Sequence, residues 1–259
     1  MIKPFLIVLA VLCFSGLTYS QTISLGLKGG ITIPHLPAPG AKNNVFNGGY
    51  RSRLEPDVSI FVDVRFSDWL SLQPTMEYAV QGGDKNGFQA IPFPEELIPE
   101  LHGQTPPEYL YADIQSTATF NYLLFPVLVK LGLNLGSSPF RVYGGIGPFV
   151  GILLNARQKT SGHSTVYLDE DKQTLVPDPA HPKSPLVYTF DANIDSKDEL
   201  NTTNVGLEGI LGIAYKLNRS SIFIEGGGNY GFLDIQKEKT NGQNHTGAVV
   251  VSLGYAYTL

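Results

Sequence analysis

The chain has 259 residues and a formal net charge of −5, and only 16% of its residues are charged. An acidic balance argues against nucleic acid as a partner, because nucleic acid selects basic surfaces. The single cysteine, Cys13, lies close to the first residue, so no disulfide is expected in the rest of the chain.

The first twenty residues have the pattern of a secretory signal peptide. Lys3 is followed by an apolar run from Phe5 to Leu17, and then by small and polar residues. This run is too short to span a bilayer and is typical of a cleaved export signal. We therefore expect a signal peptide over residues 1–20 and an exported domain over residues 21–259, with no lipid anchor.

Beyond the signal, the sequence alternates between apolar and polar residues with the period of two that is typical of strands. No apolar stretch there reaches the roughly 18 to 20 residues that a transmembrane helix needs. A membrane-embedded chain without such helices must form a closed barrel, because lipid cannot satisfy unpaired backbone groups. The eight predicted strands are Thr22 to Ile33, Asp57 to Ser67, Trp69 to Gln81, Thr119 to Leu133, Phe140 to Asn155, Thr203 to Leu217, Ser221 to Ile235 and His245 to Leu259.

The connections between these strands alternate in length. Outer-membrane barrels have short periplasmic turns and long extracellular loops, with both termini on the short-turn side. We therefore predict an all-β, eight-stranded antiparallel transmembrane β-barrel in a bacterial outer membrane, with long extracellular loops and periplasmic termini. The tight turns are 67–68, 134–138 and 218–220, and the longer loops are 34–56, 82–118, 156–202 and 236–244.

One parity of each predicted strand is apolar, and we expect it to face lipid. Aromatic residues on this face, such as Phe66 and Tyr78, lie near strand ends, as the interfacial girdles of membrane barrels require. The face comprises Ile23, Leu25, Leu27, Ile31, Ile33, Val58, Ile60, Val62, Val64, Phe66, Leu70, Leu72, Met76, Tyr78, Val80, Phe125, Val127, Val129, Leu131, Val142, Ile146, Val150, Ile152, Val205, Leu207, Leu211, Ile213, Ile222, Ile224, Val249, Val251 and Leu253.

The opposite parity is small or polar and carries nearly all the charged side chains of the strands. Five cations and four carboxylates are close to balance, and unpaired buried charge is costly, so ion pairs across the lumen are expected. Eight strands enclose an interior that side chains just fill, so a wide pore is excluded. A narrow polar path through the lumen remains an alternative. The predicted lumen charge network is Lys28, Asp63, Arg65, Glu77, Lys130, Arg141, Glu208, Lys216 and Glu225.

Two mid-chain segments, Asn121 to Lys130 (NYLLFPVLVK) and Arg141 to Gly151 (RVYGGIGPFVG), resemble the PorT-like outer-membrane β-barrel proteins of Bacteroidetes. The segment Gly26 to Gly30 (GLKGG) is similar to the first strand of that family. The resemblance implies a barrel and, through the founding member's association with a secretion apparatus, an accessory role in secretion or envelope assembly. Pro126 and Pro148 interrupt strand hydrogen bonding, so β-bulges are expected there.

The last eight residues, Ser252 to Leu259 (SLGYAYTL), resemble the terminal strand signal of outer-membrane barrels. The pattern is carried by Ser252, Gly254, Tyr257 and Leu259, which we expect the barrel assembly machinery to read during biogenesis. Outer-membrane lipid and this machinery are therefore predicted partners. Secretion or envelope proteins are further candidates.

The sequence offers few residues that could carry catalysis. The five histidines show no metal-ligand spacing, and no G-x-S-x-G motif is present. His163 beside Ser164 is the best candidate pair, although neighbours in sequence do not make a triad. Asp191 to Asp195 (DANID) begins like a calcium loop, but Ser196 replaces its glycine. We expect no cofactor and favour a noncatalytic scaffold, with a narrow channel for small solutes or a lipid-modifying or proteolytic barrel enzyme as alternatives.

The second long loop, 82–118, carries apolar residues such as Ile91, Phe93, Leu110 and Tyr111 among prolines and acids. Apolar groups in a loop usually meet a partner or pack on one another. We expect this loop to fold as a lid over the barrel mouth, with a partner-binding patch as the alternative.

Overall fold

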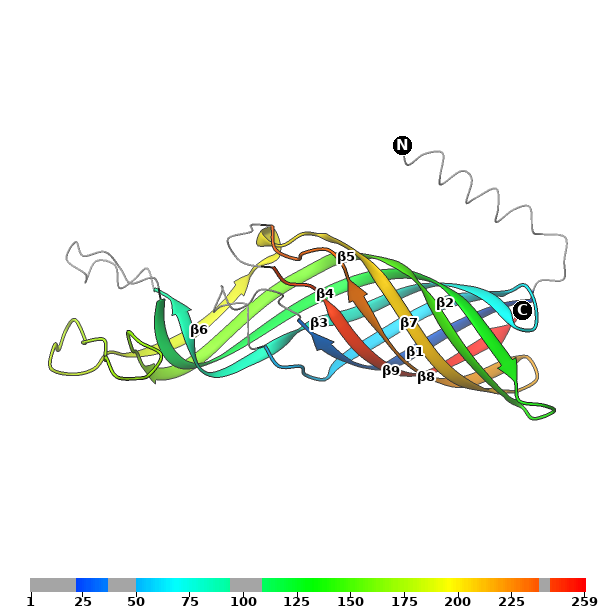
Figure 1. Ribbon diagram of the computed structural model, residues 1–259, viewed down its shortest axis with the longest axis horizontal. Coiled ribbons are helices and arrows are strands. Elements are labelled where there is room, and N and C mark those ends of the chain that lie inside the picture. The colour runs from blue at the N-terminus through cyan, green and yellow to red at the C-terminus, as the bar shows by residue number, and fades with distance from the viewer. Residues whose placement is uncertain (1–21, 37–49, 94–108, 238–242) are drawn as a thin grey trace, which may run out of the picture.

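The computed structural model describes residues 22–36, 50–93, 109–237 and 243–259. Within them, eight antiparallel strands close into a ring, and β6 adds to one side of it (Figure 1). No described helix is long and apolar enough to cross a membrane. The predicted eight-stranded barrel is confirmed. The elements are β1 (Thr22–His35), β2 (Glu55–Arg65), β3 (Leu70–Pro92), β4 (Tyr109–Asn134), β5 (Phe140–Thr165), β6 (Val187–Asp195), the 3-10 turn η4 (Lys197–Glu199), β7 (Thr203–Lys216), β8 (Ser220–Gly231) and β9 (Gly247–Thr258).

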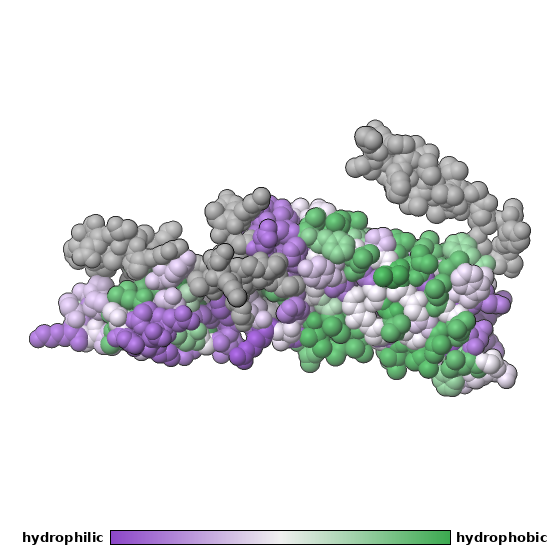
Figure 2. Space-filling model, viewed as in Figure 1, coloured by the Kyte–Doolittle hydropathy of each residue, from purple (hydrophilic) through white to green (hydrophobic). Residues whose placement is uncertain are grey.

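The ring strands alternate buried and exposed side chains along their length. In β1, Leu25 and Leu27 are 48% and 59% exposed on the outer face, whereas Lys28 on the inner face of the same strand is 3% exposed. Figure 2 shows the hydrophobic side chains gathered over the barrel and the hydrophilic ones over the part that projects from it. Of the apolar residues predicted to face lipid, all but Val80 are exposed or half-buried on the outer surface.

Three ring strands continue well beyond the others. β5 pairs with β7 from Phe140 to Ile152 and then with β6 from Arg157 to Thr165. β3 and β4 remain paired as far as Pro92 and Tyr109. The result is a sheet extension, formed by β6 and the projecting parts of β3, β4 and β5, at the end opposite the short turns (Figure 1).

The sheet extension has an apolar core of its own, which corrects the prediction that residues 82–118 and 156–202 are two long loops. Leu110, Ala112 and Val166 are almost fully buried in it, at 0%, 0% and 1% exposure. The segment between β5 and β6 folds over this face, since the Val176 N–H donates to the Val166 carbonyl at 3.0 Å and the Leu186 N–H donates to the Val176 carbonyl at 2.7 Å. The remaining members of the core are Ile91, Ile114 and Leu186, with Phe93, Tyr188 and Phe190 packed against them.

A second apolar cluster fills the lumen where the sheet extension meets the ring. Its wall residues are on the inner parity of β4 and β5 and include Phe120, Tyr122 and Phe149. Residues from three other connections close over them, namely Leu36, Tyr50, Leu200 and Ile235. These four side chains therefore cover the mouth, whereas Ile91 and Leu110 of the second loop pack in the sheet extension. Residues 94–108 of that loop lie outside the described residues.

The strands β4 and β5 keep one register across their two prolines. Pro126 pairs with Phe149 and Val129 pairs with Ile146, with no residue inserted between these pairs. The register shift lies instead beside Tyr122, nearer the sheet extension. The prediction of bulges at the prolines was wrong, because the missing N–H groups interrupt the hydrogen bonds without adding a residue.

Gly147 makes this close strand pairing possible. A Cβ added at Gly147 would collide with the carbonyl oxygen of Val127 on β4. The Gly147→Ala substitution should therefore destabilise the barrel by about 1–3 kcal/mol, because backbone rather than a flexible side chain must move. Urea unfolding in lipid vesicles measures this change. Gly226→Ala is the matched control, since nothing lies within 4 Å of its added Cβ. Equal effects of the two substitutions would contradict the close approach.

Candidate functional site

The inner parity of the ring places the nine residues of the predicted charge network in the lumen. Their burial varies with position along the barrel: Lys28, Glu77 and Glu225 are 3%, 2% and 2% exposed, whereas Arg65 and Lys216 are half-buried near the short turns. The charges of opposite sign are not mixed evenly. They form a carboxylate layer in the middle of the lumen and a basic layer near the short turns.

The carboxylate layer consists of Glu77, Glu208, Glu225 and Asp57 around Lys28. The Lys28 ammonium lies 3.1 Å from the Glu225 carboxylate, and both side chains are 3% exposed. Asp57 is completely buried and lies beside the Glu77 carboxyl group. Sequence reasoning missed Asp57, although it shares the parity of Asp63 and the period of two along β2 could have revealed it.

Glu225 joins the two layers. Its second oxygen accepts a hydrogen bond of 2.9 Å from the Tyr143 hydroxyl and lies 3.8 Å from the Lys130 ammonium. Lys130 also donates to the Gln73 side-chain oxygen at 2.6 Å, and it lies 4.2 Å from the centre of the Tyr143 ring. One carboxylate thereby connects side chains from β1, β4 and β5 with its own strand, β8.

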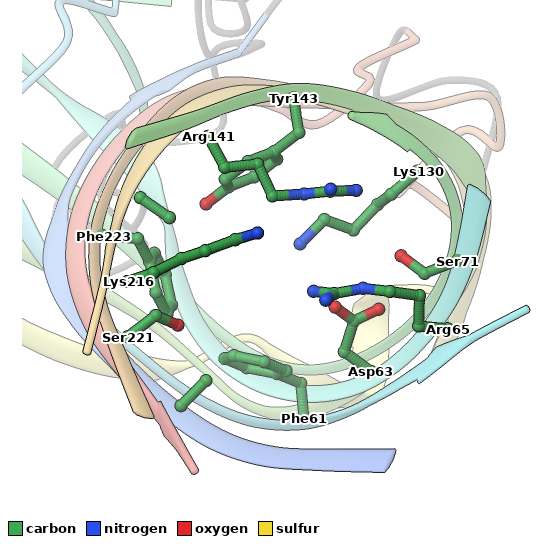
Figure 3. Close-up of a pocket in the computed structure, with 12 residues that line it drawn as sticks. Phe61, Asp63, Arg65, Ser71, Lys130, Arg141, Tyr143, Lys216, Ser221 and Phe223 are labelled. Atoms are coloured by element: carbon green, nitrogen blue, oxygen red, sulfur yellow. The ribbon is translucent and has the colours of Figure 1, made fainter. Parts of the chain in front are cut away.

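The basic layer consists of Arg65, Lys130, Arg141 and Lys216, with Asp63 beside them (Figure 3). These side chains surround a cavity of about 50 Å³ near the short turns. A cavity needs about 10–15 Å³ to hold one water, so there is room for several waters or one small ion.

The candidate catalytic pair does not assemble. His163 and Ser164 are neighbours on β5, and successive strand residues point to opposite faces. The His163 Nδ1 atom lies 2.8 Å from the Thr189 hydroxyl, whereas Ser164 donates to the Thr165 carbonyl at 2.9 Å and accepts from the Asp113 N–H at 2.9 Å. The two side chains are therefore engaged separately on the surface of the sheet extension.

The calcium-like segment Asp191 to Asp195 is a strand rather than a loop. It forms the C-terminal part of β6, where Asp191, Asn193 and Asp195 are exposed. Within the described part of the chain, no group of three or more His, Cys, Asp or Glu side chains is placed to hold a metal ion.

The predicted assembly signal lies at the seam of the barrel. Ser252 and Gly254 point inward on β9, whereas Tyr257 and Leu259 are 43% and 68% exposed on the outside. Tyr257 pairs with Leu25 of β1, so this strand completes the ring. Recognition by the assembly machinery stays a prediction.

The Lys28–Glu225 pair can be tested by substitution. Lys28→Met should destabilise the barrel by about 3–5 kcal/mol, because it leaves Glu225 charged among three other buried carboxylates. The double substitution Lys28→Met with Glu225→Gln should recover most of this loss, since it removes both charges together. Unfolding free energies of the two single variants and the double variant give the coupling energy. Additive losses would show that the two residues act independently.

The match to a protein family agrees with a membrane barrel. Residues 19–237 match the family described as outer membrane protein beta-barrel domain. No curated protein matches the sequence. Similar solved structures include Ail, the attachment invasion locus protein of Yersinia pestis, with 10% identity over 90% of this chain and 98% of that chain and a TM-score of 0.36.

Two other solved structures are similar at the same low level of identity. Neisserial surface protein A is 12% identical over 92% of this chain and 99% of its own, with a TM-score of 0.35. The outer membrane protease OmpT of Escherichia coli is 9% identical over 94% of this chain and 100% of its own, with a TM-score of 0.33. Because the family match spans most of the sequence, the chain belongs to the outer membrane protein beta-barrel domain family and lies in the bacterial outer membrane.

Proposed function

We propose that this protein is a noncatalytic scaffold that uses its sheet extension to bind another protein at the cell surface. In this proposal the short turns and both termini are periplasmic, as is usual for outer-membrane barrels. The single observation that carries the proposal is the sheet extension itself, an ordered sheet with a buried core outside the lipid-facing band. A solvated loop would not require such a core.

The open side of the sheet extension is suited to binding a partner. Between Val187 and Asp195, β6 pairs with β5, and no second strand neighbour is present among the described residues. Val187 and Ile194 are 47% and 53% exposed along it. An uncovered edge strand presents unpaired backbone groups, and an extended segment of a partner can add to such an edge.

The PorT-like segments support a more specific role within this proposal. The segment Asn121 to Lys130 lies in β4, and Arg141 to Gly151 lies near the start of β5. Both segments are part of the barrel wall. They favour a PorT-like barrel of Bacteroidetes, for which the partner would be a component of secretion or envelope assembly.

Disrupting the sheet extension should remove the partner and leave the barrel intact. Leu110→Asp places a charge in a position with 0% exposure, which should unfold the sheet extension. Leu168→Asp is the control, because Leu168 is 43% exposed on the same part of the molecule. After crosslinking in the native outer membrane, envelope proteins should co-purify with the wild type and with Leu168→Asp, but not with Leu110→Asp.

The shift in mobility that a folded barrel shows on heating should be the same for all three proteins. Loss of that shift in Leu110→Asp would show that the sheet extension is part of the barrel core. Recovery of the wild type as a lone barrel would contradict the scaffold proposal.

The lumen itself should not conduct. The apolar cluster around Phe120, Tyr122 and Phe149 excludes water from one part of the barrel, and the Lys28–Glu225 pair occupies the next. An ion would have to lose its hydration to pass, which is costly in an apolar constriction. Planar bilayers containing the purified protein should therefore show no discrete conductance steps. Regular steps would contradict the closed lumen and favour the channel alternative.

A further inference from the structure

We propose that the basic layer near the short turns is a binding site for a phosphate-type oxyanion. This site is independent of the sheet extension, because it lies at the opposite end of the barrel. It is the cavity between Arg65, Lys130, Arg141 and Lys216, drawn in Figure 3.

The four cations converge although they come from four different strands. Arg65 ends β2, Arg141 is the second residue of β5 and Lys216 ends β7, so three of them lie beside short turns. Lys130 reaches the same space from the interior of β4. In Figure 3 their charged groups point toward one another across the cavity. Groups of like charge that face one another across a small cavity repel, and an ion of opposite charge between them relieves this repulsion.

The surrounding side chains supply little of that opposite charge. Among the described residues that line the cavity, Asp63 is the one carboxylate. Among the described residues, no carboxylate lies within 4.0 Å of a nitrogen of Arg65, Arg141 or Lys216. The buried Nε of Arg65 has no hydrogen-bond partner within the part of the chain that the structure describes. Glu225, from the adjoining carboxylate layer, lies 3.8 Å from Lys130. The four cations and one carboxylate of the cavity lining still leave a net positive charge.

Neutral groups hold these cations in place. Arg141 donates to the Asp68 backbone carbonyl at 2.6 Å, and Lys216 donates to the Asn134 side-chain oxygen at 2.6 Å. Such contacts fix the direction of a charged group without neutralising it. The basic layer is thus positioned in advance for an anion, which lowers the cost of binding one.

The geometry favours a compact oxyanion. The planar guanidinium groups of Arg65 and Arg141 match the spacing of phosphate oxygens, and the hydroxyls of Ser71 and Ser221 line the same cavity. Deeper in the lumen lies the carboxylate layer, which repels an anion and makes the cavity a dead end. A free phosphate ion and the phosphate of a lipid headgroup share this chemistry, and both fit the proposal.

The experiment uses the full chain purified in a maltoside detergent that carries no phosphate. Inorganic phosphate and glycerol 3-phosphate are titrated separately by calorimetry, and the thermal unfolding temperature is followed in parallel. Saturable binding of inorganic phosphate alone would identify a free ion as the ligand. Binding of glycerol 3-phosphate as well would identify a phosphomonoester, the form that the phosphate has in phosphatidic acid. No saturable binding of either up to about 10 mM would overturn the proposal.

Three substitutions locate the site. Arg65→Gln should weaken phosphate binding by about tenfold or more, since it removes a charge-assisted contact. Arg219→Gln is the matched control, because Arg219 lies in the short turn between β7 and β8 and does not line the cavity. Asp63→Asn should strengthen binding, because it removes the carboxylate that competes with the anion.

The gain expected for Asp63→Asn separates an anion site from a purely structural role, which would predict a loss of stability and no gain in affinity. If Arg65→Gln fails to fold, as judged by its mobility on heating, Lys216→Gln provides the same test. Equal weakening by the cavity substitution and by Arg219→Gln would contradict the proposed location, because the loss would then reflect only the overall charge.

Discussion

The closure of the backbone hydrogen-bond ladder is the constraint on which the rest of this structure depends. Lipid offers no hydrogen-bond donor or acceptor, so each strand in the membrane must have a neighbour on both sides. The register of β1 with β9, from Ser24 opposite Thr258 to His35 opposite Gly247, supplies the last of these neighbours. Closure with eight strands fixes a narrow interior, and every inward side chain must then be packed or paired within it.

That narrow interior explains why the lumen is divided along its axis. The apolar cluster around Phe120 and Tyr122 fills the end beneath the sheet extension without needing hydrogen bonds. Charged residues occupy the remainder, where Glu225 contacts Lys28, Lys130 and Tyr143 together. Glu225 is thus the link between an acidic middle and a basic end, and a cation on either side reduces the cost of burying its charge.

The period of two was sufficient to predict the barrel but not the contents of its lumen. It worked for β1 and β9, where one face is apolar and the other is small or polar. In β4 the residues of both faces are apolar, so the sequence alone could not show that Phe120 and Leu124 face inward. Gly82, Gly83 and Gly87 resemble turn residues in sequence, so the continuation of β3 into the sheet extension was not predicted. The separation of charges depends on the tilt and stagger of the strands, which parity along one strand does not reveal.

The sheet extension differs from a tethered loop because its strands are continuous with the barrel wall. β4 carries Lys130 in the basic layer, Phe120 in the apolar cluster and Leu110 in the core of the sheet extension. Backbone pairing with β3 runs without a break in register from Leu70 opposite Leu131 to Pro92 opposite Tyr109. β6 pairs in turn with β5, so its edge is joined to the barrel wall by backbone hydrogen bonds. A partner that binds a surface fixed in this way loses less conformational freedom, and affinity is gained without a larger contact area.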